Sequence, residues 1–238
     1  MKIPLPPDTA KLPRVILHTA VSADGRIDGH VPDIGLYYGL AAKFEEDATL
    51  SGSETLLRAP GQGTDADIAA AAPGSDAAPV AGSELDERPL LVLVDSRGRV
   101  RNLAWWRRQP YWRDIVILAS RATPREYLEY LKSLKIEALI HGEDKTDLRA
   151  GLEALAFRYG VRTVRVDSGG TLNGILLRQG LVDEFSLVVS PALVGGTSPR
   201  SSFRAPDLET PDGAIPLRLI HMEKFDGGAV WLRYEVVK

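Results

Sequence analysis

The feature that most constrains this chain is residues 164–177, where a β-branched run stops at two glycines and an apolar run follows. Leu172, Ile175 and Leu176 recur at helical spacing. We therefore expect a strand, a tight turn in which Gly169 and Gly170 can adopt positive φ and let a ligand reach the backbone, and then a helix. The first-turn N–H groups of such a helix can hold a phosphate, although Gly-Gly is equally typical of an ordinary turn.

The rest of the chain alternates between strand-like and helix-like segments and predicts an α/β fold. The last third has strand-like segments without helices between them, which predicts a mainly parallel central sheet finished by antiparallel strands. Strands are expected at 14–22, 48–50, 88–95, 114–120, 136–141, 162–167, 185–193, 215–225 and 230–237. Helices are expected at 36–47, 124–134, 146–159 and 171–179.

One segment, residues 59–87, interrupts this alternation. It is rich in Ala, Gly, Pro, Asp and Ser and has almost no large apolar side chains. Such a segment cannot bury enough apolar surface to offset the entropy lost on ordering. We therefore expect a single domain over residues 1–238 with a flexible, low-complexity insertion at about 59–87.

Composition excludes several functional classes. The 238-residue chain has no cysteine, which excludes a disulfide framework, a thiol nucleophile and Cys-ligated zinc. Its formal net charge of −3 gives no electrostatic basis for nucleic-acid binding. No apolar run approaches the roughly 20 residues of a membrane span, and the start has no signal-peptide pattern. We expect a cytoplasmic protein without nucleic-acid or membrane partners and without a metal.

Five motifs in order carry a family resemblance: 22–26 (SADGR), 95–97 (DSR), 169–174 (GGTLNG), 179–185 (QGLVDEF) and 190–196 (SPALVGG). Together they resemble the pyrimidine reductase of riboflavin biosynthesis, the reductase domain of the bifunctional deaminase-reductase. The resemblance covers roughly residues 13–196. It implies a dihydrofolate-reductase-like fold, with helices on both faces of the sheet, and NADPH-dependent reduction of a ribosylamino-pyrimidine 5′-phosphate to the ribitylamino product.

The resemblance also implies site residues. The glycine turn matches the segment that holds the cofactor's pyrophosphate, Ser96 matches a serine near the adenosine phosphate, and Arg97 beside it suits the 2′-phosphate because a guanidinium fits phosphate geometry. A second turn at 52–55 also borders the cofactor in this family. The implied cofactor-binding residues are Ala20, Gly52, Ser53, Thr55, Ser96, Arg97, Gly169, Gly170, Thr171, Leu172 and Asn173.

Three residues are candidates for the chemistry. Asp167 matches an acidic position that faces the substrate in the family, and it can hold a substrate amine or orient a proton-donating water. His18 stands where the family commonly has a lysine, and its ordinary pKa suits a proton donor. Asp24 lies in the first Asp-Gly turn. Each also has a plain structural interpretation: a strand-end cap for Asp167, a core histidine for His18 and a turn former for Asp24.

The chain departs from the family pattern on the substrate side, at His18, at 32–38 and at 56–60. Two alternatives therefore stay open: a reductase of a pterin or another heterocycle on the same fold, and a non-catalytic nucleotide-binding module. The family also implies a homodimer, and the apolar strands expected at 185–193 and 230–237 give a physical reason for one. An uncovered apolar strand favours pairing with a second chain.

Overall fold

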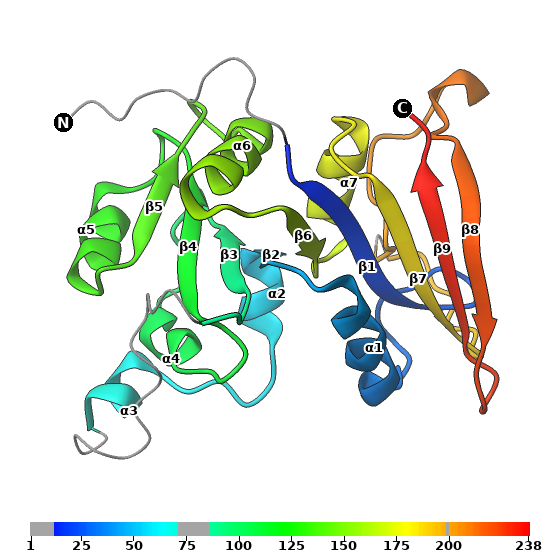
Figure 1. The fold of residues 1–238 in the computed structure, drawn as a ribbon, viewed down its shortest axis with the longest axis horizontal. Coiled ribbons are helices and arrows are strands. Elements are labelled where there is room, and N and C mark those ends of the chain that lie inside the picture. The colour runs from blue at the N-terminus through cyan, green and yellow to red at the C-terminus, as the bar shows by residue number, and fades with distance from the viewer. Residues whose placement is uncertain (1–11, 71–85, 199) are drawn as a thin grey trace. The chain divides into compact units, whose positions relative to one another are not determined.

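The computed structural model describes residues 12–70, 86–198 and 200–238. These residues form two compact units, one built mainly from residues 47–162 and the other from residues 14–46 and 163–238. Figure 1 labels the helices and strands of both units. Each unit is an α/β structure with its own sheet region and core, and we describe them in turn.

The unit of residues 47–162 contains four parallel strands in the order β5-β4-β3-β2. Helices connect the strands, as a parallel arrangement requires. The strands are β2 (Ala48–Gly52), β3 (Leu90–Val94), β4 (Asp114–Ala119) and β5 (Glu137–Ile140). The helices are α2 (Ser53–Arg58), α3 (Asp65–Ala70), α4 (Leu103–Arg107), α5 (Arg125–Ser133) and α6 (Leu148–Tyr159).

Both faces of β2, β3 and β4 are buried, whereas the edge strand β5 is partly exposed. Ile115 and Ile117 of β4 share a buried cluster with Tyr127 and Leu131 of α5. Leu118, which alternates to the opposite face of the same strand, lies against Gly151 of α6, where a Cβ would come within 3.0 Å of it. The near-continuous apolar sequence of these strands follows from this burial on two sides.

The unit of residues 14–46 and 163–238 contains five strands in the order β6-β1-β7-β9-β8. β6, β1 and β7 are parallel, whereas β9 is antiparallel to β7 and to β8. The strands are β1 (Arg14–Ser22), β6 (Thr163–Val166), β7 (Glu184–Ser190), β8 (Leu217–Lys224) and β9 (Val230–Val236). The helices are α1 (Ile34–Ala41), the 3-10 turn η1 (Ala42–Phe44), α7 (Gly170–Arg178) and the 3-10 turn η2 (Pro211–Gly213).

β1 is buried on both faces, because Val15, Ile16 and Leu17 are each at most 1% exposed. One face packs on α1 through a cluster that joins Ile16 to Tyr37 and Trp231. The predicted mainly parallel sheet with antiparallel C-terminal strands is therefore confirmed. The predicted bounds of β1 agree with the structure, and those of β9 differ by one residue.

Part of the segment predicted to be a flexible insertion, residues 59–87, has regular structure. Residues 65–70 form α3, whose Asp65 accepts hydrogen bonds from the backbone N–H of Ala104 at 2.8 Å and from the Tyr130 hydroxyl at 2.6 Å. Asn102 also donates to Gln62 and to the Gly63 carbonyl. These hydrogen bonds hold residues 62–65 against α4 and α5. Residues 71–85 of the predicted insertion lie outside the described residues.

The Gly-Gly turn does not use the positive φ that its glycines permit. Gly169 has φ −81° and ψ 167°, which is extended backbone, and Gly170 is not among the residues with positive φ. Ile175 does not share a buried face with Leu172 and Leu176, because it is 42% exposed while they are buried. The strand, turn and helix themselves are confirmed.

Candidate functional site

The candidate site in the unit of residues 14–46 and 163–238 is the end of β6, where Asp167 follows the strand and α7 begins three residues later. Leu17 of β1 pairs with Val166 of β6, so Asp167 follows at the level of His18. Carboxyl ends of parallel strands are where open α/β sheets bind ligands. The register therefore brings two of the predicted residues, Asp167 and His18, to neighbouring positions.

Asp167 belongs to a charged group with Arg165 and Glu46. The Nη1 of Arg165 donates to Oδ2 of Asp167 at 3.0 Å, and its Nε donates to Oε1 of Glu46 at 2.8 Å. The Tyr37 ring is buried nearby, and its hydroxyl donates to the His18 carbonyl at 3.0 Å. Burial, followed by the nearby charge of Asp167, raises the pKa of Tyr37 well above 10.0.

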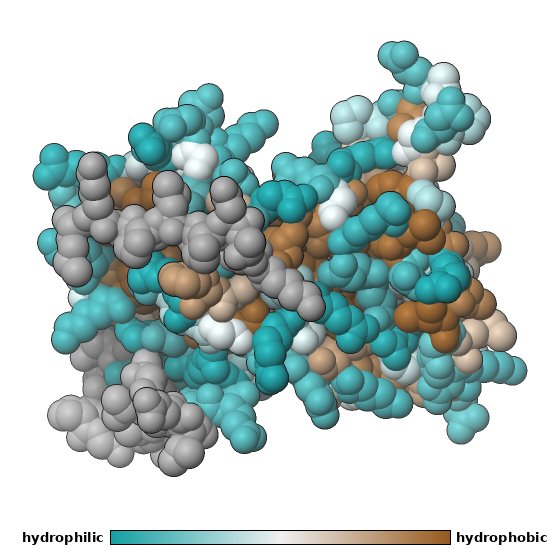
Figure 2. Space-filling model, turned by 45° about the horizontal axis from the view of Figure 1, so that its top comes forward, coloured by the Kyte–Doolittle hydropathy of each residue, from teal (hydrophilic) through white to brown (hydrophobic). Residues whose placement is uncertain are grey.

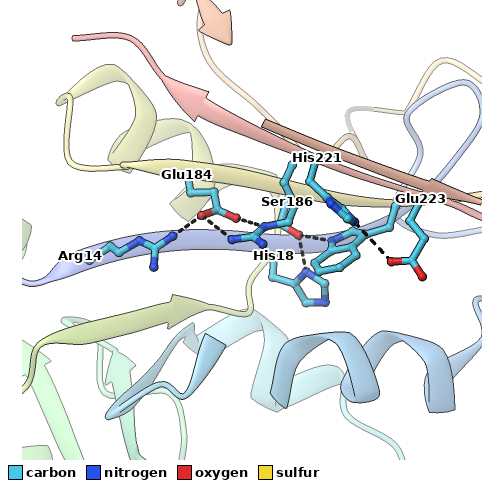
Figure 3. Close-up of polar contacts among 8 residues, drawn as sticks. Arg14, His18, Glu184, Ser186, His221 and Glu223 are labelled. Carbon is cyan, nitrogen blue, oxygen red and sulfur yellow. Dashed lines mark hydrogen bonds and ion pairs between the residues drawn. The ribbon is translucent and has the colours of Figure 1, made fainter. Parts of the chain in front are cut away.

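His18 is only 1% exposed and lies in a continuous hydrogen-bond chain (Figure 3). The Trp231 indole N–H donates to Oγ of Ser186 at 2.8 Å, and that hydroxyl lies 2.9 Å from Nδ1 of His18. The Tyr37 carbonyl lies 3.1 Å from Nε2 and can only accept, so Nε2–H of the neutral ring donates to it and Nδ1 accepts from the Ser186 hydroxyl. Both ring nitrogens are thus used inside the core.

Burial lowers the pKa of His18 from 6.5 to about 4, and the hydrogen bond to Tyr37 only partly opposes this effect. A neutral imidazole whose one N–H already donates to a carbonyl has no proton to give to a ligand near neutral pH. This geometry supports the interpretation of His18 as a core histidine over that of a proton donor.

Asp24 binds a neighbouring loop. Its carboxylate accepts hydrogen bonds from the Ser22 hydroxyl at 2.5 Å and from the backbone N–H groups of Val194 and Gly195 at 3.1 and 2.6 Å. These bonds lower the pKa of Asp24 from 3.8 to about 2, the Ser22 hydroxyl contributing most. This geometry supports the turn-forming interpretation of Asp24 over a catalytic one.

The glycine turn is shaped by the chain's own backbone. A Cβ on Gly170 would lie 2.1 Å from the carbonyl oxygen of Ser201, and one on Gly174 would lie 1.8 Å from that of Arg204. Asn173 is fully buried and donates to the carbonyl of Ser202 at 2.8 Å. Gly170 and Asn173 therefore face the loop of residues 201–204, and this packing explains them without any phosphate.

The remaining residues of the predicted pyrophosphate segment differ in accessibility. Gly169 has open space, since the nearest atom to an added Cβ is 3.9 Å away on Ile27. Thr171 is exposed in the first turn of α7, whereas Leu172 is buried. Ala20 is half-buried near the end of β1. An anion at this helix N-terminus would therefore meet Gly169 and Thr171.

The other predicted cofactor residues lie in the unit of residues 47–162. Gly52 is the N-cap of α2, and the Ser53 hydroxyl accepts from Nη2 of Arg99 at 2.9 Å. Thr55 is half-buried in α2, and Ser96 and Arg97 follow β3, so all five cluster at the carboxyl ends of β2 and β3. Among the described residues, no hydrogen bond or ion pair involves the exposed Arg97 guanidinium.

Comparison with known proteins decides the family, because the model of the RibD C-terminal domain matches residues 13–231. The chain belongs to the RibD C-terminal domain family. A 2,5-diamino-6-ribosylamino-4(3H)-pyrimidinone 5′-phosphate reductase of Methanothermobacter thermautotrophicus is 28% identical over 87% of this chain and 91% of its own length. The reductase of the same name from Archaeoglobus fulgidus is 38% identical over 47% of this chain, a match that spans about half, 49%, of that relative.

Solved structures of low sequence identity show the same fold. RibD of Acinetobacter baumannii superposes with a TM-score of 0.70 at 22% identity, over 96% of this chain and 59% of that chain. The riboflavin biosynthesis reductase Rib7 of Saccharomyces cerevisiae superposes with a TM-score of 0.58 at 18% identity, over 97% and 92% of the two chains. The expected dihydrofolate-reductase-like fold is thereby confirmed.

Sequence reasoning missed Arg165, Glu46 and Tyr37 as parts of the site. A signal for Arg165 was present, since an arginine between Val164 and Val166 in a buried strand needs an acidic partner. Nothing in the sequence identifies Glu46 as that partner, because the two lie 119 residues apart.

Within the described ranges, no helix is long and apolar enough to cross a membrane.

Proposed function

We propose that this chain is an NADPH-dependent reductase that converts a ribosylamino-pyrimidine 5′-phosphate to its ribitylamino product. The observation that carries the proposal is the family match over residues 13–231 together with relatives named as the pyrimidinone phosphate reductase. The structure supports it with an ionisable carboxylate, Asp167, beside the glycine turn that opens α7. The same assignment supports a cytoplasmic enzyme.

The accessible residues fit a nicotinamide dinucleotide phosphate. Gly169 leaves open space at the N-terminal end of α7, where Thr171 is also exposed, and a helix N-terminus favours a pyrophosphate. Arg97 carries an exposed guanidinium suited to a 2′-phosphate, and Ser96 precedes it. When bound, NADPH supplies the hydride.

Asp167 is the residue placed to act on the substrate. Its carboxylate is partly exposed, and Arg165 holds one of its oxygens at 3.0 Å. A carboxylate accepts hydrogen bonds, so it can hold an amino group of the pyrimidine or orient a water. Neither His18 nor Tyr37 is a suitable proton donor near neutral pH. The pKa of His18 is lowered to about 4, so its ring is neutral, and the pKa of Tyr37 is raised well above 10.0, so its hydroxyl is a weak acid. A water oriented by Asp167 is therefore the proton source we propose.

We further propose that the enzyme is a homodimer formed through its C-terminal strands. β8 is an edge strand of its unit, and its exposed side chains include Leu219, Ile220 and Met222, at 51%, 47% and 67% exposure. Figure 2 shows hydrophobic surface on the side that carries β8 and β9. An edge strand with exposed apolar side chains favours pairing with a second copy.

The test of the activity follows the loss of NADPH absorbance with three candidate substrates. Turnover with the ribosylamino-pyrimidinone 5′-phosphate supports the proposal, and Asp167→Asn should reduce kcat about 100-fold or more. Turnover only with dihydrofolate would establish the pterin alternative. NADPH binding, seen by fluorescence, without turnover of either substrate would establish a nucleotide-binding module.

A further inference from the structure

A charged side chain stands inside the most buried part of the candidate site. Arg165 lies in β6 between Val164 and Val166, both fully buried, and only 4% of its own side chain is exposed. A guanidinium removed from water in this way is strongly unfavourable unless carboxylates surround it. The burial of Arg165 in the strand therefore has to be explained by the carboxylates that it binds.

Arg165 holds two carboxylates with different surroundings. Glu46, bound through Nε at 2.8 Å, has an 11% exposed side chain. Asp167, bound through Nη1 at 3.0 Å, has a 26% exposed side chain. Glu46 therefore anchors the guanidinium on the buried side, while Asp167 presents its carboxylate at the more open side. The formal charge of this Arg165–Glu46–Asp167 triad is −1.

The charge state of the triad follows from its environment. Burial alone would lower the pKa of Arg165, but the attraction of Asp167 and Glu46 outweighs it and raises this pKa above its ordinary value. The arginine therefore stays charged and keeps its planar donor geometry at any pH at which the protein functions. Because the guanidinium is planar, its hydrogen bond to Glu46 through Nε also fixes the direction in which Nη1 donates to Asp167.

We propose that Arg165 is a positioning residue: anchored by Glu46, it fixes the Asp167 carboxylate in one orientation at the end of β6. The proposal rests on the proposed function, in which Asp167 faces the substrate. A carboxylate held in one orientation accepts hydrogen bonds from amino groups and from water in a defined direction.

A second buried ion pair in the same unit supplies the control. Arg233 binds Glu184 through Nε at 2.5 Å and through Nη2 at 3.0 Å, and Glu184 is 3% exposed. Figure 3 shows Glu184 close to Arg14, which is its other partner. The Arg233 side chain is 25% exposed, and Arg233→Met removes its ion-paired guanidinium without altering Arg165, Glu46 or Asp167. It should lower stability and leave kcat within about twofold of wild type.

The test is a double-mutant cycle on kcat with Arg165→Met and Asp167→Asn. If Arg165 acts through Asp167, each single variant lowers kcat at least tenfold, and the double variant is no slower than Asp167→Asn. Arg165→Lys should recover part of the loss, because an ammonium retains one ion pair. NADPH affinity, measured by fluorescence, should stay within about twofold in all variants.

Crystal structures of Arg165→Met and Arg233→Met give a readout that does not depend on turnover. The proposal expects the Asp167 carboxylate to leave its wild-type position only in Arg165→Met. An unmoved Asp167 in that variant, or losses in kcat that multiply in the double variant, would overturn the proposal. If wild type fails to reduce the pyrimidine substrate, the proposed activity fails, and the Asp167 position alone decides the role of Arg165.

Discussion

Acid should destabilise this protein through His18, and the size of the effect follows from the buried hydrogen-bond chain. His18 is 1% exposed, with Ser186 and the Tyr37 carbonyl on its two ring nitrogens. Its pKa is 6.5 in an unfolded chain and about 4 in the folded protein. Between these values the unfolded state binds the proton and the folded state does not, so stability is fully present above pH 6.5 and is lost as the pH falls.

The magnitude comes from the same two pKa values. One pKa unit corresponds to about 1.4 kcal/mol, so the full effect below pH 4 is about 3 kcal/mol. Between pH 7 and pH 5 the expected loss is about 2 kcal/mol, a large fraction of the stability of an ordinary domain. The protonated imidazole would also lose the bond from the Ser186 hydroxyl, because Nδ1 could no longer accept.

The assay is urea unfolding followed by circular dichroism at several pH values between 7 and 4.5. Wild type and His18→Leu are compared, since leucine cannot titrate. The free-energy difference between the two proteins should shrink by about 2 kcal/mol from pH 7 to pH 5. His141→Gln, in the other unit, should follow the wild-type curve. Parallel curves for wild type and His18→Leu would refute the argument that His18 is buried and neutral.

Three further outcomes are expected. Gly170→Ala should displace the loop of residues 201–204 and destabilise the protein by about 2 kcal/mol or more, whereas Gly169→Ala should cost under about 1 kcal/mol; equal losses in urea unfolding would contradict the packing argument. Asp65→Ala should cost about 1–2 kcal/mol by the same assay, because Ala104 and Tyr130 lose their acceptor, while Asp67→Ala on the exposed side of α3 should cost less; the reverse order would show α3 to be unanchored. Ile220→Glu should convert the proposed dimer to monomer in light scattering at micromolar concentration; a wild-type mass near 25.9 kDa would exclude the dimer.

Most of the fold could be predicted from local patterns, and the failures have physical reasons. β1 follows from a near-continuous apolar run, and α6 from helical spacing with Gly160 as its stop, in the left-handed conformation at φ 66°. α4 has only five residues, too few for a periodicity signal, and its stability comes from packing. α3 was hidden by a composition typical of disorder, because composition cannot show a polar anchor such as Asp65.

The candidate site was predictable only in part. Asp167 is a candidate because it matches an acidic position of the family, and its role in the site stays a prediction. The sequence did not identify Glu46 or Tyr37, because their proximity depends on how α1 and η1 return to the sheet. The sequence also could not show that His18 is a poor candidate for the proton donor, because sequence gives the ordinary pKa of a histidine, whereas burial lowers the pKa in the folded protein.

The glycine turn shows why motif and mechanism have to be separated residue by residue. Gly170 and Gly174 are required because the backbone of residues 201–204 lies where their Cβ atoms would be. Gly169 has no such neighbour, and its extended backbone is open to any residue. A substitution at Gly170 therefore reports on packing, and one at Gly169 reports on ligand binding.

Gly169→Asp, which adds a carboxylate without displacing the loop of residues 201–204, should weaken NADPH binding measured by fluorescence about tenfold or more. Unchanged affinity would mean that the pyrophosphate binds elsewhere.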